Sequence, residues 1–355
     1  MRFFPLSFHP AILVVAGVAF GALALGASAL GSTQSFVQSS ARSAAPDVHY
    51  SGGAIVPASA RYSRFPALYF PPPAASPDTD AMLDRGSFDL KASEQAALIP
   101  AIANNRILAF YGKPDSKSMG ILGEYSKEDI ATIMEGYARL YKEQSGDQGV
   151  VCAFYLIYGT CWPGGEIGYL KDSTVKEYID FAAKHGMLVF VDHQIGKYPV
   201  ADAVNRLLPW LKYPNVHIAL DPEWRTVAPM QVIGSVKADE INEAEKAMSE
   251  YIEAEGIPGI KMLVVHQFQD RMITERDKVR ADYDGVLLVH TADGFGPPAL
   301  KRASYAFNAK ALNMPIKGFK LFFKTTVKGA GYDEPLLLPA DVLALDPSPR
   351  LVIYQ

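Results

Sequence analysis

Eight short apolar segments recur between residue 106 and the end of the sequence, and they limit the possible folds more than any other feature. They cover residues 106–112, 149–159, 186–194, 215–223, 261–268, 285–293, 318–324 and 350–355. Each is a nearly continuous apolar run, without the polar–apolar alternation of a strand that has one face in water. Such runs are typical of parallel strands that are buried on both faces.

Amphipathic segments with helix-capping signals separate several of these runs. Residues 126–144, 172–186 and 235–256 carry such signals, and the last two segments end at Gly186 and Gly256. The connections after the fifth, sixth and seventh runs are less clearly helical. Strands that alternate with crossover segments predict an α/β fold, a (β/α)8 TIM-type barrel with its eighth strand at the C-terminus and no helix after it.

A doubly wound open sheet is the alternative fold for the same order of elements. Such a sheet often carries a Gly-rich dinucleotide-binding turn after its first strand, and no such turn follows residues 106–112. We therefore predict a barrel domain over residues 91–355. A helix expected at residues 91–105 could cover the barrel where an eighth crossover helix would otherwise lie.

The first 90 residues differ in composition from the rest of the chain. Residues 1–30 place Arg2 ahead of a long apolar run that ends in an Ala-Ser-Ala cleavage pattern. This predicts a signal peptide, and the alternative is a retained N-terminal membrane anchor. Residues 31–90 are rich in Ser, Ala and Pro and predict a linker. We expect an exported protein, extracellular or at the cell surface, with the N-terminal segment as its membrane tether if it is retained.

The overall composition is that of an ordinary globular protein. Hydrophobic residues make up 49% of the chain and charged residues 20%, and the formal net charge is −4. Proteins that bind nucleic acid usually carry an excess of basic residues, which this chain lacks. We therefore expect no nucleic-acid partner.

Polar side chains concentrate at the C-terminal ends of the predicted strands, whereas the strand bodies carry almost no charge. In β/α barrels this end holds the active site. Loops are polar in any protein, but this explains less well an acid or a histidine directly after an apolar run on four strands. The strand-end residues are Tyr111, Lys113, Tyr158, Asp192, Gln194, Asp221, Glu223, Trp224, His266, Gln267, His290, Asp293, Lys324 and Gln355.

The stretch VHIALDPEWR, residues 216–225, places two acids at the end of the fourth strand. Asp221 and Glu223 are two residues apart, so in an extended chain both point to the same side. Hydrolysis of a glycosidic bond uses one protonated carboxyl group as acid and a second carboxylate as nucleophile or base. Unequal burial can separate their pKa values. We predict Glu223 as the general acid, with Asp221 and Asp192 as the candidate partner carboxylates.

The other strand-end residues predict a surface that binds a carbohydrate or a cell-envelope glycan. An aromatic side chain such as Trp224 offers a face to a sugar ring, although Trp224 could equally cap the barrel. Histidine and glutamine side chains can hydrogen-bond sugar hydroxyls. The residues assigned to substrate binding are Trp224, Tyr111, Tyr158, Gln194, His266, Gln267, His290, Asp293 and Lys324.

Two other functions fit the same residues. A non-catalytic glycan- or surface-binding barrel would keep the pocket, and Asp221 would then be a structural acid that bonds loop amides. A metal-dependent hydrolase could draw its ligands from the acids and histidines at the strand ends. The first strand lacks the His-x-His pair of metal-dependent barrel hydrolases, and no His-Glu-x-x-His helix is present. We therefore expect no metal and no cofactor.

Several motifs, taken together and in order, resemble a family of uncharacterised exported bacterial proteins. They are YGKP at 111–114, MGILGEY at 119–125, ALDPEW at 219–224, VVHQF at 264–268, DGFG at 293–296, PALKR at 298–302, GFKLFFK at 318–324 and LVIYQ at 351–355. The resemblance covers roughly residues 106–355 and implies export, but it carries no activity.

The acid-x-acid pair after the fourth strand also resembles that of barrel glycoside hydrolases, including secreted muramidases. This likeness rests on Asp221 and Glu223. The muramidase pattern has an aspartate at the first strand, where this chain has Tyr111 and Lys113. The resemblance therefore implies a glycoside hydrolase-like barrel and leaves its substrate open.

Overall fold

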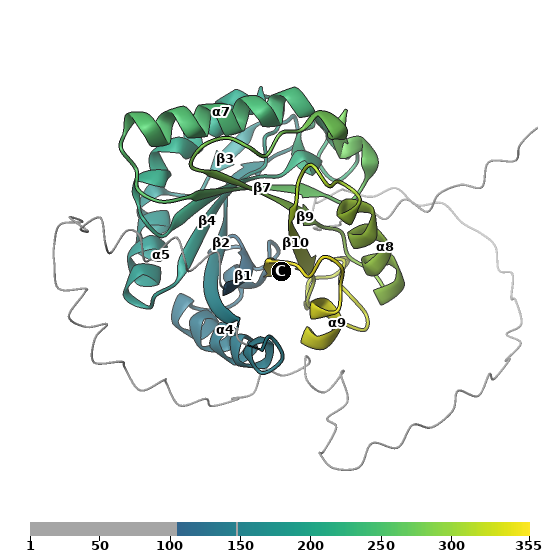
Figure 1. Ribbon diagram of the computed structural model, residues 1–355. Coiled ribbons are helices and arrows are strands. Elements are labelled where there is room, and N and C mark those ends of the chain that lie inside the picture. Colours follow the sequence, from purple (N-terminus) through teal and green to yellow (C-terminus); the bar gives the residue numbers. More distant parts are fainter. Residues whose placement is uncertain (1–104, 147) are drawn as a thin grey trace, which may run out of the picture.

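The computed structural model describes residues 105–146 and 148–355, in which eight parallel strands close into a barrel (Figure 1). The first strand, β1, pairs with both β2 and β11, and this double pairing closes the sheet. The predicted eight strands and the TIM-type barrel are confirmed. In spatial order the strands are β1 (Asn105–Gly112), β2 (Gly149–Cys161), β4 (Leu188–His193), β5 (Val216–Leu220), β7 (Lys261–Gln267), β9 (Val286–Ala292), β10 (Ile316–Leu321) and β11 (Leu351–Tyr354).

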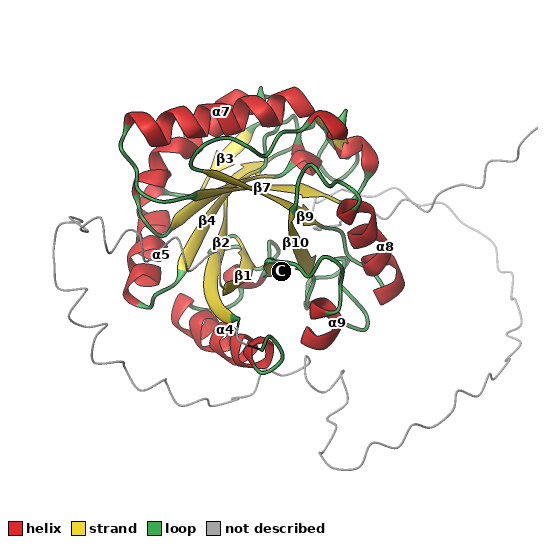
Figure 2. Ribbon diagram, viewed as in Figure 1, coloured by secondary structure: helices red, strands yellow, loops and turns green. Residues whose placement is uncertain are grey.

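Helices surround the barrel on the outside (Figure 2). Three of them, α4, α5 and α7, correspond to the helices that the sequence predicts. The helix α8 forms the sixth connection, for which the sequence signal is weak. The helices are α4 (Lys127–Lys142), α5 (Asp172–Lys184), α6 (Val200–Leu207), α7 (Ala238–Ala254), α8 (Pro298–Ala309) and α9 (Pro339–Leu343).

Short elements fill the other connections. A 3₁₀ segment, η2 (Leu208–Lys212), follows α6, and another, η3 (Pro222–Trp224), follows β5. The strand β3 (Ile167–Tyr169) extends β2 as an antiparallel hairpin. Strands β6 (Val236–Lys237) and β8 (Ile273–Thr274) pair outside the barrel, and the described residues between β7 and β9 form 3₁₀ turns and loop in place of a crossover helix.

Three expectations for the N-terminal part concern residues that the structure does not describe. The signal peptide or anchor at 1–30 and the linker at 31–90 lie outside the described residues. The helix expected at 91–105 also lies outside them, apart from Asn105, which begins β1. Within the described part of the chain, no helix has both the length and the apolar character needed to span a bilayer.

Alternating side chains along each strand form two separate cores. On β1, Ile107, Ala109 and Tyr111 point into the barrel, whereas Leu108 and Phe110 point outward and pack under the helices. The alternation follows from the two-residue period of a strand. The outer core is the larger one, and it holds the helices against the barrel. Near the ends of most strands the inward positions carry polar side chains, so the polar site begins where the inner core stops.

The outer core predicts a large loss of stability for Phe154→Ala. Phe154 is fully buried on β2, and its ring meets Tyr178 and Phe181 of α5 with centroids 5.0 and 5.9 Å apart. Removing the ring leaves a cavity between helix and barrel, and we expect the free energy of unfolding in urea to fall by about 3–5 kcal/mol. Leu312→Ala is the control, because Leu312 is 84% exposed, and it should change stability little. Equal effects would contradict this account of the core.

Candidate functional site

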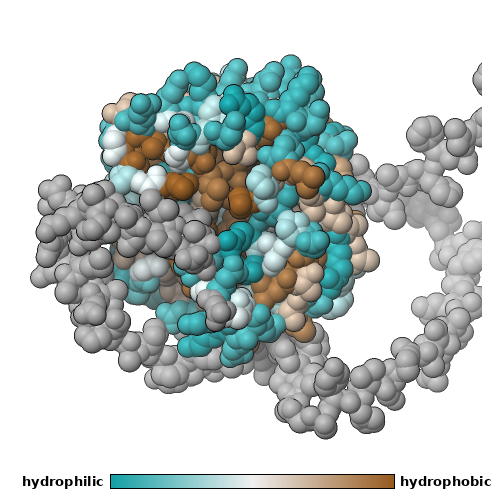
Figure 3. All heavy atoms as spheres, viewed as in Figure 1, coloured by the Kyte–Doolittle hydropathy of each residue, from teal (hydrophilic) through white to brown (hydrophobic). Residues whose placement is uncertain are grey.

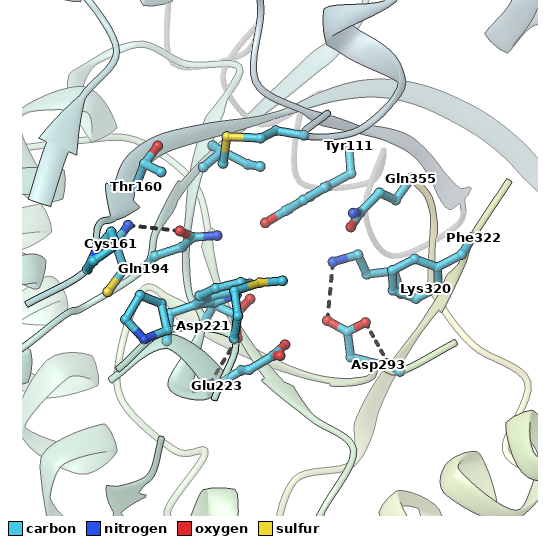
Figure 4. A pocket seen from close by; sticks show the side chains of 17 residues that line it. Tyr111, Thr160, Cys161, Gln194, Asp221, Glu223, Asp293, Lys320, Phe322 and Gln355 are labelled. Carbon is cyan, nitrogen blue, oxygen red and sulfur yellow. Dashed lines mark hydrogen bonds and ion pairs between the residues drawn. The ribbon is translucent and has the colours of Figure 1, made fainter. Parts of the chain in front are cut away.

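A cavity of about 390 Å³ opens at the C-terminal end of the barrel strands. The chain's C-terminus lies on this face, and apolar residues gather near the centre of the face (Figure 3). The apolar lining comes from Met119, Ile157, Pro163, Trp224, Pro229, Met230 and Phe322. The other lining residues are Tyr111, Thr160, Cys161, Gln194, Asp221, Glu223, Asp293, Gly294, Lys320 and Gln355 (Figure 4).

The strand period explains which side chains reach this cavity. Tyr111 and Lys320 each lie four residues after an inward position on the same strand, Ile107 and Ile316. Gln355 lies two residues after the inward Ile353, directly beyond the end of β11. Positions two apart on a strand share a face. These strands therefore deliver side chains from their inward face to the same cavity above the inner core.

Asp221 and Glu223 leave the fourth barrel strand together and both line the cavity. Asp221 caps the 3₁₀ turn η3, and its Oδ1 accepts a hydrogen bond of 3.1 Å from the backbone N–H of Glu223. The intervening Pro222 is buried and restricts the backbone of the turn. Within the described part of the chain, neither carboxyl group forms an ion pair, so both remain available to a ligand.

The surroundings raise the pKa values of both acids. Burial raises the pKa of Asp221 from its ordinary 3.8 to about 7, against the opposing effect of His266. Glu223 keeps partial access to the cavity, yet burial of its carboxyl group, and next the Asp221 charge, raise its pKa well above 4.5. Both carboxyl groups therefore hold their protons to a higher pH than exposed acids do, a property that general acid catalysis requires.

Asp293, directly after β9, is the ionised acid of the site. Its Oδ2 accepts hydrogen bonds from Lys320 Nζ at 3.2 Å and pairs with His266 Nδ1 at 3.1 Å, while its Oδ1 accepts from the Gly294 N–H. Burial alone would raise the pKa of Asp293, but Lys320 and His266 outweigh it and hold the pKa below the usual range. The second nitrogen of His266 bonds the Tyr155 hydroxyl at 2.7 Å.

Asp192 lies beside the cavity and does not line it. It is fully buried, and its Oδ2 accepts a hydrogen bond of 2.8 Å from the Tyr111 hydroxyl. Its Oδ1 is buried with no hydrogen-bond partner among the described residues, and burial raises the pKa of this carboxyl group. An unpartnered buried oxygen is less costly on a neutral acid than on a carboxylate. The structure thus places Asp192 as the residue that holds Tyr111, rather than in contact with a substrate.

The cluster holds more acids than cations. The four acids are Asp192, Asp221, Glu223 and Asp293, and the cationic side chains that face them are Lys320 and His266. Burial lowers the pKa of His266, but the Asp293 hydrogen bond and the Asp221 charge outweigh it and raise this pKa. Buried charge is costly unless it is paired, so the arrangement favours protons on part of the acids. This charge imbalance, together with burial, accounts for the raised pKa values around the cavity.

Gln267 and His290 do not reach the cavity, contrary to the sequence-based assignment. His290 Nε2 bonds Gln267 Oε1 at 2.8 Å, and Lys317 Nζ lies 3.3 Å from His290 Nδ1. Lys317 also donates to carbonyl oxygens at the end of α8, and Arg276 donates to Gln267. Gln267 follows His266 on β7, and His290 precedes Thr291 on β9. His266 and Thr291 occupy inward positions, so the side chains of Gln267 and His290 point outward and lie under α8.

Tyr158 and Lys324 are also displaced from the site. Tyr158 follows the inward Ile157 on β2 and therefore points outward, where its hydroxyl donates to Asp172. Lys324 lies beyond the end of β10, is exposed, and pairs with Glu334 at 3.3 Å. The expectation that these two residues would share the pocket is not met, because a one-residue step reverses the face of a strand and a few residues of loop lead away from it.

Gln194, Trp224 and Gln355 do line the cavity. The side-chain oxygen of Gln194 accepts a hydrogen bond of 2.9 Å from the Cys161 N–H, which leaves its amide nitrogen for other partners. Lys113 bonds the Thr160 hydroxyl at 3.0 Å at the edge of the cavity.

The sequence analysis missed Lys320 and Tyr155. Lys320 is almost fully buried, and its ammonium group lies 3.8 Å from the centre of the Tyr111 ring. Its signal was present in the sequence, since a lysine in the middle of the apolar run GFKLFFK has no solvent to reach and requires a buried anion. Tyr155 gave no comparable signal, because a tyrosine in a buried strand is most simply a core residue.

The glycines of the first strand–loop motif bring Met119 to the cavity wall. Gly120 has φ 91°, and a Cβ atom there would lie 2.4 Å from the Tyr111 carbonyl oxygen. Only glycine fits such a close approach in this conformation. The loop that contains Met119 therefore folds back against the end of β1, next to Tyr111.

Among the described residues, no group of three or more His, Cys, Asp or Glu side chains has an arrangement that could hold a metal ion. The acids and histidines proposed as ligands in the metal-dependent alternative instead lie in three places. Asp221, Glu223 and Asp293 line the cavity, Asp192 and His266 are fully buried beside it, and His290 lies under α8. His266 was assigned to substrate binding from the sequence, but it does not reach the cavity because both of its ring nitrogens bond buried side chains.

No family model matches the sequence, and no curated protein gives a significant match. Among solved structures, the chain is similar to an oxaloacetate acetylhydrolase in complex with oxalate, with 12% identity, 74% of this chain and 79% of that chain covered, and a TM-score of 0.41. It is similar to 2,3-dimethylmalate lyase, a PEP mutase/isocitrate lyase superfamily member, with 13% identity, 75% of this chain and 81% of that chain covered, and a TM-score of 0.42. It is also similar to a family 18 chitinase from Crocus vernus, with 10% identity, 70% of this chain and 92% of that chain covered, and a TM-score of 0.39. These proteins are named for different activities, and at such low identity no activity is carried over to this chain.

The raised pKa of Asp221 predicts a measurable dependence of stability on pH. A carboxyl group with a higher pKa in the folded than in the unfolded chain stabilises the fold fully below its ordinary pKa of 3.8, and this contribution is lost as pH rises through about 7. Between pH 5 and pH 8 the free energy of unfolding should therefore fall more for wild type than for Asp221→Asn, by on the order of 2 kcal/mol.

Urea unfolding of both proteins at the two pH values measures this difference. Asp277→Asn is the control, because Asp277 is exposed on a surface turn, and its pH dependence should match wild type. If Asp221→Asn also matched wild type, the pKa of Asp221 would not be raised.

Proposed function

We propose that this protein is an exported glycoside hydrolase that acts on a polysaccharide or cell-envelope glycan by carboxylate acid/base catalysis. One observation carries the proposal. Asp221 and Glu223 line the same cavity, form no ion pair within the described part of the chain, and both have raised pKa values. Export rests on the sequence of residues 1–30 alone.

The roles are assigned from the chemistry that each acid would supply. Glu223, whose pKa is raised by burial and next by the Asp221 charge, is the acid that donates its proton to the glycosidic oxygen as the C–O bond breaks. Asp221, with a pKa of about 7, supplies the carboxylate that stabilises the developing positive charge, either as nucleophile or as base for water. Asp293 is held by Lys320 and His266 and so is not free for either role.

The rest of the lining suits a small polyol ligand. Trp224 and Phe322 offer apolar surface to a sugar ring, and Gln194, Lys320 and Gln355 can hydrogen-bond its hydroxyls. A cavity of about 390 Å³ lies within the range of roughly 300–1,000 Å³ found for small-ligand sites. It therefore suits the end of a glycan chain or a short oligosaccharide.

A non-catalytic glycan-binding barrel is the competing function, and the ion pairs separate the two. Such a barrel would be expected to neutralise its acids with nearby cations. Instead, Arg225 pairs with Glu240, Lys324 pairs with Glu334, and Lys113 bonds Thr160. These three cations of the strand-end loops are thus engaged elsewhere, which favours the catalytic interpretation.

The test is release of reducing ends from a panel of peptidoglycan and envelope polysaccharides by the full chain. Glu223→Gln and Asp221→Asn should each lower the rate by about 10²–10⁴-fold, the usual range for loss of an acid or base. The wild-type rate should rise with pH through about 7 as Asp221 ionises.

Glu253→Gln, an exposed change on α7, should leave the rate unchanged. Hydrolysis that survives both active-site changes would refute the assignment of the pair. Tight binding of a glycan without any hydrolysis would favour the binding barrel.

A further inference from the structure

A second hollow, of about 350 Å³, lies on the outside of the barrel between α5, α6 and η2. We call it the side groove. Its main lining residues are Tyr158, Lys176, Arg206, Trp210, Lys212 and Tyr213. One strand separates it from the cavity, since Ile157 of β2 points into the cavity and the next residue, Tyr158, points into the side groove.

The side groove has an aromatic floor. The rings of Trp210 and Tyr213 lie nearly parallel, with centroids 6.2 Å apart and planes inclined by 27°. Tyr158 meets Trp210 edge to face at 5.8 Å and so fixes its orientation. Trp210 and Tyr213 remain partly exposed. Two partly exposed, nearly parallel rings present an apolar surface on which the C–H face of a sugar ring can stack.

Three cations surround these same rings. Lys176 and Lys212 hold their ammonium groups 5.6 and 5.4 Å from the centre of the Tyr213 ring, and the Arg206 guanidinium lies 5.6 Å from the Tyr158 ring. The acid among the lining residues is Asp172, so the lining carries a net charge of about +2 on a chain whose net charge is −4. This local reversal of sign attracts anions to the side groove.

The cations are available to a ligand. Arg206 approaches Asp172 at 3.6 Å, and both side chains are about half exposed. Lys176 pairs with Asp180 on the surface of α5. Exposed pairs of this kind contribute little and exchange readily for another anion. No ion pair of Lys212 is found among the described residues.

We propose that the side groove binds a glycan whose sugar rings carry carboxylate groups. The spacing supports this ligand, because the cations lie within about 6 Å of the rings that would stack the sugar. An acid attached to the stacked ring itself falls within their reach. A neutral glycan would leave the cations unused, and a flexible phosphate chain would leave the aromatic floor unused. Binding here does not require Glu223 or hydrolysis, so it stands apart from the proposed activity.

The experiment titrates the full chain with an oligogalacturonate in a calorimeter at low salt. Arg206→Gln/Lys212→Gln should weaken binding about tenfold, since two exposed charge contacts are lost. The control is Lys246→Gln/Lys278→Gln, which removes the same charge from exposed sites elsewhere and should bind as wild type does. Glu223→Gln should also bind as wild type does, and raising the salt concentration should weaken binding.

Four results would overturn the proposal. One is equal affinity of wild type and the groove variant, with both shown to be folded by thermal unfolding. Another is equal affinity for a neutral oligosaccharide such as a cello-oligosaccharide, which would mean that charge plays no part. The third is equal affinity for inorganic polyphosphate, which would show that the side groove recognises charge without a sugar ring. Loss of binding in Glu223→Gln alone would place the glycan in the cavity and so would also refute it.

Discussion

The closure of the barrel is the constraint on which the rest of the structure depends. Because β1 pairs with β2 on one side and β11 on the other, no strand of the barrel has a free edge, and every strand has one side chain in two pointing into a closed interior. Small residues such as Ala109 and Ala219 and large ones such as Tyr155 and Phe190 fill that interior. Above them the same positions carry polar groups from different strands, and closure makes these groups meet.

Bringing these groups together in a dry interior is unfavourable unless their charges are balanced. The charge of Asp293 is balanced by its pairing with Lys320 and His266. The remaining acids have raised pKa values and so hold their protons to a higher pH. A proton that is held because of burial is also one that can be given to a substrate. The same electrostatic cost that makes the cluster destabilising thus makes Asp221 and Glu223 suitable for acid/base chemistry.

Some strand-end residues predicted from the sequence lie at the site and others do not, and the difference depends on which face of the strand each side chain occupies. Asp221, Glu223, His266 and Asp293 were found because they follow apolar runs directly, and the barrel brings them together. Gln267 and His290 follow apolar runs equally closely, yet they lie under α8, because each is one residue away from an inward position. Closeness to a strand end predicts that a residue lies near the C-terminal end of the barrel. Whether its side chain points into the barrel or outward depends on whether it lies an even or an odd number of residues from an inward position.

The sequence by itself determined the eight strands, the main crossover helices and the chemical nature of the strand ends, because hydrophobic runs, helix caps and acids are local features of a chain. The tertiary structure decided which polar residues share the cavity, that Lys320 neutralises Asp293, and that Trp210 and Tyr213 form a second aromatic surface with Arg206 and Lys212 nearby. These contacts join residues far apart in the sequence. They arise only when the sheet closes and each side chain takes its side of the barrel wall.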